Sequence, residues 1–436
     1  HITGCEVLPV LGMENPWHYR NKMQFPAAKT EGKIQIGCYA ALTHNVINID
    51  DCLIQKQANN KIMQVVRQWM QQFNISAYDE TTGKGVVRHV MGRAGAKTGE
   101  VMAVIVIACY DIPHAGELVT MLKTEVDGLK SIVQNINKKR TNIIMGAKNR
   151  VLYGKSTIKD RLGNLKFNIS PLSFFQVNSA QTEKLYATAL DFAALSGKET
   201  VIDCYCGTGT ISLYLAQKAR KVYGIEIVEP AIKDANKNAK ANNIANAEFI
   251  CGDAALEMPA LLKSGVKPDT VLLDPPRAGC DKKVLAAIAG VKSEKIVYVS
   301  CNPASLARDM AFLTENGYKA VKAQPVDMFP MTSHIETVVL LGRELEKSRE
   351  HVYLDYEPSK EIDLPGGATY SEIQQWVQAE YGLKVSSLYI SQVKRKCGLD
   401  VGQNYNLSKK EDAKVPQCPP EKEAAIEAAL KHFKMI

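Results

Sequence analysis

Strand-like and helical runs alternate from about Ser170 onward, and this alternation restricts the fold more than any other feature. A helix is expected over Ser179 to Leu195, and the strand-like runs follow it. They cover Thr200 to Asp203, Lys221 to Glu226, Glu248 to Cys251, Thr270 to Asp274, Lys295 to Ser300 and Glu336 to Leu341. Such alternation is typical of α/β domains with a doubly wound parallel sheet. We therefore predict a Rossmann-like sheet over residues 170–343.

The residues before and after this predicted sheet show a different pattern of strands and helices. Strands are expected at Gly85 to Val90 and Val101 to Cys109, helices at Asn59 to Phe73, Ala115 to Ile136, Ser371 to Glu380 and Pro420 to Phe433. The pattern predicts a mixed α/β domain over residues 1–169. A linker and a small helical accessory segment are expected over residues 344–436. The chain begins with His1, so we expect further residues upstream.

Positive charge is concentrated in the first part of the chain. The net charge is +8. Residues 1–170 carry 22 Lys and Arg against 13 Asp and Glu, whereas the remainder carries 32 against 33. Nine basic residues and one acid, Asp160, lie between Lys138 and Lys166. This run is either a solvated basic face or a surface that follows the phosphates of a nucleic acid.

Hydropathy and cysteine content exclude other classes of protein. No run approaches the roughly 20 apolar residues of a membrane helix, and the start lacks the basic region of a signal peptide. The 11 cysteines form no Cys-x-x-Cys pair and no disulfide-like framework. A reducing cytoplasm fits this usage better than secretion. We expect a cytoplasmic monomer without membrane contact.

Three successive strand ends carry groups that suit a nucleoside cofactor. The first leads into Gly207-Thr208-Gly209, the second ends at Glu226, and the third is followed by Asp253. Glycines allow a ligand to approach the backbone at a helix start. Glu226 is placed to accept hydrogen bonds from ribose hydroxyls, and Asp253 to meet the adenine amino group. Ser212 replaces the third glycine of a dinucleotide site, which favours S-adenosylmethionine over a nicotinamide.

The fourth and fifth strands end in residues that point to covalent catalysis. The fourth runs into Asp274-Pro275-Pro276-Arg277, a rigid turn at the ligand-binding edge. The fifth ends at Cys301, followed by Asn302-Pro303. The last strand is expected to begin at His334, with His334 and Glu336 on one face. A lone cysteine is often a small core residue, but its position here favours a nucleophile beside a methyl donor.

Methylation of carbon 5 of uridine needs both a thiolate and a base. Carbon 5 of uracil is a poor nucleophile, and thiolate addition to carbon 6 turns it into an enolate that can attack a methyl group. A base must then remove the carbon 5 proton before the thiolate leaves. Cys301 and Glu336 are the predicted nucleophile and base, and partial burial of Glu336 would suit it to neutral pH.

The chain resembles the RNA uracil-5-methyltransferase family, and especially its 23S ribosomal RNA branch. The matching motifs are Ser173 to Asn178, Asp203 to Gly209, Asp274 to Gly279, Ser300 to Pro303, Leu306 to Asp309, Asp327 to Pro330 and His334 to Glu336. The resemblance implies Cys301 as nucleophile and Glu336 as base. It also implies that S-adenosylmethionine lies against Gln176, Tyr205, Glu226 and Asp274, with Asp253 on the adenine side.

The resemblance is weaker over residues 1–169. Cys52 is similar to the last ligand of the family's four-cysteine iron–sulfur site. The family's other three cysteines, and the N-terminal RNA-binding barrel that many members carry, lie upstream of where this chain starts. Cys52 alone cannot hold a 4Fe–4S cluster, so a cluster is expected only if upstream cysteines exist, and no metal site is expected within this chain.

Three alternatives remain open on the sequence. A tRNA uridine could be the substrate in place of 23S ribosomal RNA, since a fold does not choose its substrate. A methyltransferase acting on nitrogen could share the Asp-Pro-Pro turn, but it would not need Cys301 with Glu336. A non-catalytic RNA-binding assembly factor could retain the fold, although the intact acid, thiol and glycine set argues against it.

Overall fold

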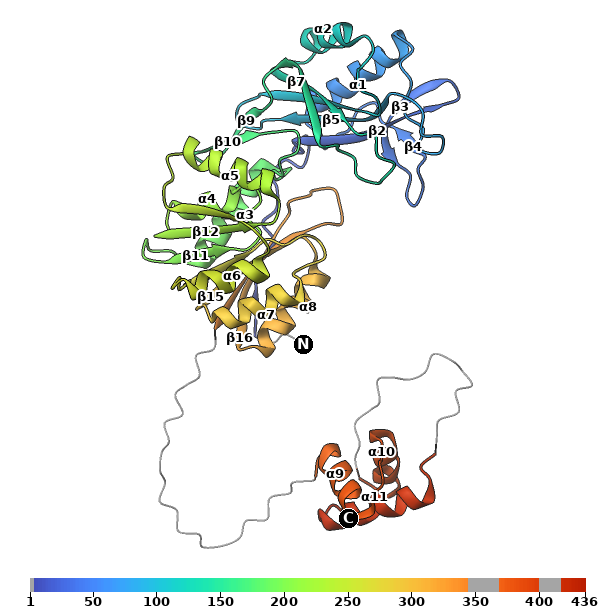
Figure 1. Cartoon of the computed structure of the whole chain (residues 1–436), viewed down its shortest axis with the longest axis vertical. Coiled ribbons are helices and arrows are strands. Elements are labelled where there is room, and N and C mark those ends of the chain that lie inside the picture. Colours follow the sequence, from blue (N-terminus) through green and yellow to red (C-terminus); the bar gives the residue numbers. More distant parts are fainter. Residues whose placement is uncertain (1–3, 344–367, 400–416) are drawn as a thin grey trace. The chain divides into compact units, whose positions relative to one another are not determined.

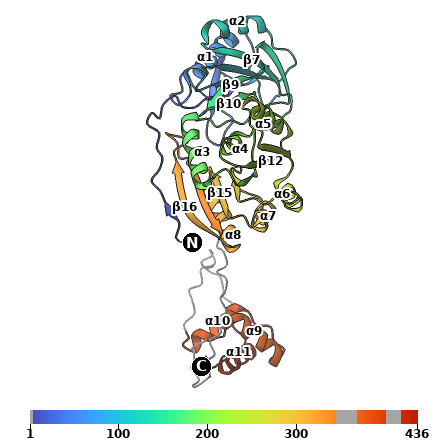
Figure 2. The same cartoon turned by 90° about the vertical axis from the view of Figure 1, so that its left-hand side faces the viewer.

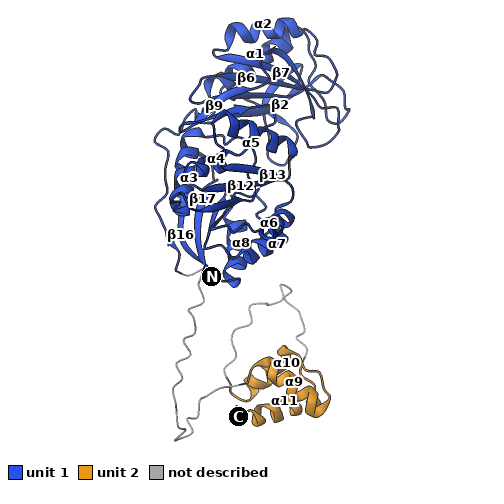
Figure 3. Ribbon diagram, turned by 60° about the vertical axis from the view of Figure 1, so that its left-hand side comes forward, with its two compact units in different colours: residues 1–347 blue, residues 348–436 orange. Residues whose placement is uncertain are grey.

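The computed structural model describes residues 4–343, 368–399 and 417–436. The chain divides into two compact units, residues 1–347 and residues 348–436 (Figure 3). The first unit contains two large sheets, and the second is helical. The division at residue 169 within the first unit remains a prediction.

The first sheet occupies the N-terminal part of unit 1. It consists of β2 Lys22–Thr30, β3 Lys33–Tyr39, β4 Val46–Asn48, β5 Val87–Ala94, β6 Val101–Ile107, β7 Leu129–Ile136 and β8 Lys148–Gly154. Their order across the sheet is β4-β3-β2-β5-β6-β7-β8. β5 and β6 are buried along their whole length, because both faces of the sheet are covered. On one face pack α1 Gln57–Gln72 and α2 Ala115–Glu125 (Figure 1).

The helix expected over Ala115 to Ile136 was wrong in its second half. α2 ends at Glu125, and the chain returns as β7, which pairs parallel with β6. Val126 is extended, and Gly128 has a φ of +72°, a left-handed conformation that glycine adopts without strain. A turn at Gly128 therefore divides the expected helix into a shorter helix and a mostly buried strand.

The second sheet has the doubly wound order that the alternation predicts. It contains β1 Glu6–Val7, β11 Thr200–Asp203, β12 Lys221–Glu226, β13 Ala247–Cys251, β14 Thr270–Leu273, β15 Lys295–Ser300, β16 Tyr318–Val326 and β17 Glu336–Arg343. The order is β1-β16-β17-β15-β14-β11-β12-β13. The strands from β11 to β15 are parallel, and β17 is antiparallel to both β15 and β16. The predicted fold class is confirmed.

The sequence did not reveal the outer edge of this sheet. β16 alternates exposed lysines with buried residues, and β1 pairs parallel with it at Glu6 and Val7. The first described residues therefore pack with the second sheet, although they precede the first sheet in the chain. Because β1 and β16 are far apart in the sequence, no local sequence pattern indicates that they pair.

Helices cover both faces of the second sheet (Figure 2). Within residues 170–343 they are α3 Ser179–Ala193, α4 Thr210–Ala216, α5 Glu229–Ala241, α6 Ala254–Lys263, α7 Lys282–Val291 and α8 Pro303–Glu315. Apolar side chains of α3, α4 and α5 share a core with one face. Those of α6, α7 and α8 share a core with the other.

A short hairpin joins the two sheets into one unit. β9 Ile158–Leu162 pairs with β10 Leu165–Ile169, and its buried side chains alternate with exposed ones. The core beneath α3 also includes Met91, Met102 and Val104 of the first sheet. Unit 1 is therefore continuous in its packing.

Unit 2 has a core of its own, made by α9 Tyr370–Tyr381, α10 Ser387–Lys396 and α11 Pro420–His432. A capping box at Thr369 and Glu372 begins α9, and Gly382 in the left-handed region ends it. α9 and α11 match the helices expected at Ser371 to Glu380 and Pro420 to Phe433, whereas α10 was not predicted. Among the described residues of both units, no helix is long and apolar enough to cross a membrane.

Candidate active site

The candidate site lies where the parallel strands end, at the edge that binds ligands in open α/β sheets. After β11 the chain turns through Gly207 and Gly209, with φ of +54° and +78°. A Cβ on Gly209 would lie 2.8 Å from the Phe249 ring, so only glycine fits this turn. Glu226, at the end of β12, accepts hydrogen bonds from the backbone N–H groups of Gly207 at 3.2 Å and Val228 at 2.9 Å.

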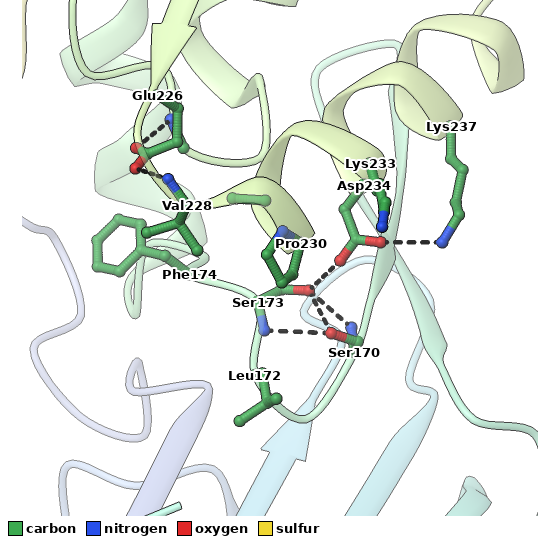
Figure 4. Close-up of a pocket in the computed structure, with 12 residues that line it drawn as sticks. Ser170, Leu172, Ser173, Phe174, Glu226, Val228, Pro230, Lys233, Asp234 and Lys237 are labelled. Carbon is green, nitrogen blue, oxygen red and sulfur yellow. Dashed lines mark hydrogen bonds and ion pairs between the residues drawn. The ribbon is translucent and has the colours of Figure 1, made fainter. Parts of the chain in front are cut away.

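A pocket of about 470 Å³ opens beside Glu226 (Figure 4). One wall is the segment before α3, with Ser173 and the exposed ring of Phe174. The other wall is the start of α5, where Asp234 accepts a hydrogen bond from the Ser173 hydroxyl at 3.0 Å. Exposed apolar side chains beside a carboxylate and a glycine turn suit a nucleoside, which has an apolar face and polar hydroxyls.

Two acids near the ends of β11 and β14 have strongly raised pKa values. Burial raises the pKa of Asp203 to about 7, against hydrogen bonds from Ser212 and the Tyr205 N–H that lower it. Burial and the charge of Asp203 raise the pKa of Asp274 to about 7. A cation such as a sulfonium would relieve this cost, since an opposite charge nearby favours the carboxylate. The residues present therefore fit S-adenosylmethionine.

Cys301 and Glu336 lie on neighbouring strands at the same edge. β15 pairs with β17 at Ser300 and Thr337, so Cys301 follows the last paired residue of one strand and Glu336 begins the other. Glu336 is 4% exposed, and burial, with Asp274, raises its pKa to about 8. Burial and the charges of Glu336 and Asp274 also raise the pKa of the half-buried Cys301 thiol, while Arg277 lowers it.

The start of α8 holds the Asp274 turn in position. Asn302 caps α8, and its amide donates to the Arg277 carbonyl at 3.0 Å. The Ser305 hydroxyl donates to the same carbonyl at 3.2 Å. Further along the turn, the buried Asp309 accepts from the Cys280 N–H at 2.7 Å. The segment that carries Cys301 therefore also fixes the turn that carries Asp274.

The strand expected to begin at His334 begins at Glu336. His334 is exposed in the preceding loop, where its Nδ1 lies 3.1 Å from the Arg277 guanidinium, and Glu336 is buried. The expectation that both share one strand face was wrong, because His334 still belongs to the loop and the strand begins only at Glu336. Arg277 is the site residue to which the sequence argument gave no role. Only its place directly after the Asp-Pro-Pro turn hinted at one.

The remaining predicted cofactor residues lie in three different environments. Gln176 is buried, and its carbonyl accepts from the Asn21 amide of the first sheet at 2.9 Å. The ring of Tyr205 packs toward the core below α6 to α8, so its backbone N–H, which donates to Asp203, forms the turn. Asp253 is exposed and caps α6 by accepting from Ala255. Their contacts with a cofactor stay predictions.

The iron–sulfur site implied by the resemblance does not fit the described residues. Within residues 4–343, 368–399 and 417–436, no group of three or more His, Cys, Asp or Glu side chains could hold a metal ion. The backbone N–H of Cys52 donates a hydrogen bond to the side-chain oxygen of Asn60. Burial, and then the charge of Cys52, raise the pKa of the Cys38 thiol. No catalytic step is therefore assigned to a cluster.

A family model described as tRNA (uracil-5-)-methyltransferase matches residues 114–344, more than half of the chain. The chain belongs to the RNA uracil-5-methyltransferase family. It is thus an S-adenosylmethionine-dependent RNA methyltransferase of the uracil-5 class, as its site chemistry predicts.

Relatives of this methyltransferase include one solved structure with a bound ligand. An uncharacterized RNA methyltransferase of Clostridium acetobutylicum is 50% identical over 342 residues, 78% of this chain and 74% of that protein. One from Caldanaerobacter subterraneus is 52% identical over 333 residues, 76% and 74% of the two chains. The Pyrococcus abyssi tRNA (uracil-54, C5)-methyltransferase, solved with S-adenosyl-L-homocysteine, is 27% identical with a TM-score of 0.64, covering 77% and 78%.

Proposed function

We propose that this methyltransferase modifies carbon 5 of a uridine in 23S ribosomal RNA through a covalent Cys301 adduct, with Glu336 as the general base. The observation that carries the proposal is the meeting of Cys301, Glu336 and Asp274 at adjoining strand ends. Methylation of a nitrogen would need neither the thiol nor a second acid beside it, because a nitrogen lone pair attacks directly.

The order of events follows from the groups present. Cys301 gives its proton to solvent, with Arg277 favouring the thiolate, and the sulfur adds to carbon 6 of the uracil. S-adenosylmethionine, when bound, supplies an electrophilic methyl group. Carbon 5 of the adduct takes that methyl while keeping its hydrogen. Glu336 then accepts the carbon 5 proton, the carbon 5–carbon 6 double bond re-forms, and the Cys301 sulfur leaves.

Two classes of RNA are candidates for the substrate, and a different similarity supports each of them. The motifs from Ser173 to Glu336 resemble the 23S ribosomal RNA branch, which favours ribosomal RNA. The likeness to the Pyrococcus abyssi tRNA enzyme favours a tRNA uridine as the second candidate. Incubating the protein with unmodified 23S ribosomal RNA and tRNA transcripts, and mapping 5-methyluridine in each, separates them. Methylation of tRNA alone would overturn the ribosomal choice.

The nucleophile is tested by trapping. The protein and an RNA substrate containing 5-fluorouridine should form a complex that survives denaturing electrophoresis, since fluorine cannot be removed as a proton is. Cys301→Ala should form no such complex and no methylated product, while keeping its affinity for S-adenosylhomocysteine. Cys109→Ala is the matched control, because this thiol is half-buried like that of Cys301 but follows β6 of the first sheet. A trapped complex with Cys301→Ala would exclude Cys301.

A further inference from the structure

Three positively charged side chains, Arg20, Lys22 and Arg93, gather at the start of β2 and on β5, and none of them has an acidic partner within the described part of the chain. Lys22 of β2 lies directly opposite Arg93 of β5 in the antiparallel register, so the two side chains share one face. Arg20 precedes Lys22 by two residues, and its Nε donates to the Lys22 carbonyl at 3.2 Å. Arg93 is 4% exposed, whereas Arg20 and Lys22 remain partly accessible.

The hydrogen bonds of these three residues end on neutral groups. The Arg93 guanidinium donates to the carbonyls of Ser173 at 2.5 Å and Pro171 at 3.4 Å, and its Nε has no partner. Among the described residues, neither Arg20 nor Lys22 forms an ion pair, and the Lys22 ammonium has no hydrogen-bond acceptor. Burial, together with Arg93 and Arg20, lowers the pKa of Lys22 to about 8. Like charges held together in this way destabilise the free protein unless an anion joins them.

The segment that carries Arg20 and Lys22 runs between two loops of the candidate active site. Asn21 donates to the Gln176 carbonyl at 2.9 Å, in the segment that lines the cofactor pocket. The Tyr19 hydroxyl donates to the Pro330 carbonyl at 3.0 Å, in the loop that leads to Glu336. The backbone that carries these two cations therefore packs against both loops of the candidate site.

We propose that Arg20, Lys22 and Arg93 form a phosphate-binding site that holds a phosphodiester of the RNA next to the target uridine. The inference rests on the proposed function and adds a contact with the substrate. A uridine that reaches a half-buried thiol must leave its stack, at a cost of a few kcal/mol. Charge-assisted hydrogen bonds to an adjacent phosphate offset that cost where the backbone bends. The competing anion is the carboxylate of the cofactor's methionine part.

Lys22→Gln tests the site without disturbing a buried guanidinium. Binding is measured on whichever transcript the wild-type protein methylates, 23S ribosomal RNA or tRNA. At about 0.1 M salt we expect the dissociation constant for RNA to rise roughly 10-fold. The salt dependence should become less steep by somewhat under one logarithmic unit, as for one lost phosphate contact. Lys22→Arg should keep most of the affinity. Lys29→Gln, an exposed lysine on the same strand, is the matched control and should change neither quantity.

The cofactor serves as the second arm of the experiment. Lys22→Gln should bind S-adenosylhomocysteine as the wild type does, and saturating 5-fluorouridine RNA should still trap it. Its thermal midpoint should not fall, because a like charge beside Arg93 is removed. A loss of cofactor affinity with unchanged RNA affinity would assign the cations to the methionine carboxylate. Unchanged RNA affinity and salt slope would overturn the inference. If the wild type itself failed to trap, the proposed function would fail instead.

Discussion

At the residue scale, the site has three acidic side chains with raised pKa values: Asp203, Asp274 and Glu336. Each is a carboxyl group whose pKa lies near 7 or 8 because protein surrounds it. A group of this kind binds a proton in the folded chain at a pH where the unfolded chain has already lost it. The chemistry of the site and the stability of the fold are therefore tied to the same protons.

The cofactor-free protein should lose stability as the pH rises from about 5 to 8. The folded pKa values exceed the ordinary values of 3.8 and 4.5. The stabilisation by protonated carboxyls is thus complete below about pH 4 and is lost as the pH passes 7 to 8. The fall should be on the order of a few kcal/mol. Urea midpoints across this range measure it.

Asp274→Asn provides the comparison for this pH effect. An amide does not ionise, so the variant should show a smaller fall in stability and a higher midpoint at pH 8 than the wild type. It should also bind S-adenosylhomocysteine less well. An identical pH profile would show that Asp274 ionises in the folded protein as readily as in water.

Glu336→Gln should separate methyl transfer from proton removal. The amide cannot accept the carbon 5 proton, so normal RNA should remain attached as a methylated covalent adduct. Turnover should fall by roughly 100-fold or more, the usual contribution of a general base. Gel shifts under denaturing conditions and mass spectrometry of the adduct detect it. Free product formed at the wild-type rate would contradict this role.

At the element scale, the pattern of burial decides which elements the sequence predicts. β11 and β15 match their expected limits, because strands buried on both faces read as nearly continuous apolar runs bounded by turns. β12 also matches, although buried and partly exposed residues alternate along much of it. β7 is also mostly buried, but it contains Lys130, Gln134 and Asn135, and without a recognised turn at Gly128 it merged with the preceding helix. β16, at the edge of the antiparallel part, alternates lysines with apolar residues and gives a weaker signal.

The same distinction applies to the site: residues at strand ends could be predicted from the sequence, whereas contacts across the two sheets could not. Cys301, Glu336 and Asp274 follow from strand-end logic within one domain. The contact between Arg93 and Ser173 spans 80 residues of sequence and links the first sheet to the segment before α3, so no local sequence pattern predicts it.

β8 is the edge strand of the first sheet and carries part of the basic run. Lys148 and Arg150 are exposed on it, and Lys155 follows. Reversing these three to Glu should weaken RNA binding and flatten its salt dependence, because contacts with phosphates are lost. Cofactor affinity should not change, since the pocket lies beside β12 and α5. Filter binding at several salt concentrations measures both effects.

A variant with the same change of charge controls for the net effect. Lys263, Lys267 and Lys282 are exposed residues of the α6 and α7 region, and reversing them should leave the salt slope unchanged. An equal effect of both triple variants would show that only total charge matters. Arg150 already pairs with Asp111 at 2.9 Å, so its own share of the effect should be the smallest of the three.

At the scale of the whole molecule, the two units have separate cores. The apolar cluster of unit 2 draws only on residues 368–435, and the clusters of unit 1 draw on residues 5–341. A chain that ends after Lys347 should therefore keep the thermal midpoint of unit 1 within ~2 °C and should still be trapped by 5-fluorouridine RNA. A truncated protein that fails to fold would disprove the independence of the two cores.

If Arg93 binds a phosphate as proposed, we expect its contact with Ser173 to make RNA and cofactor binding interdependent. Arg93 faces Lys22 on one side and holds the wall of the cofactor pocket on the other. An anion that draws the guanidinium toward Lys22 changes the hold on that wall, and a cofactor that orders the wall fixes the guanidinium. Thermodynamic reciprocity then requires each ligand to change the affinity of the other by the same factor. Titrations of RNA with and without S-adenosylhomocysteine, and the converse, should return one coupling free energy.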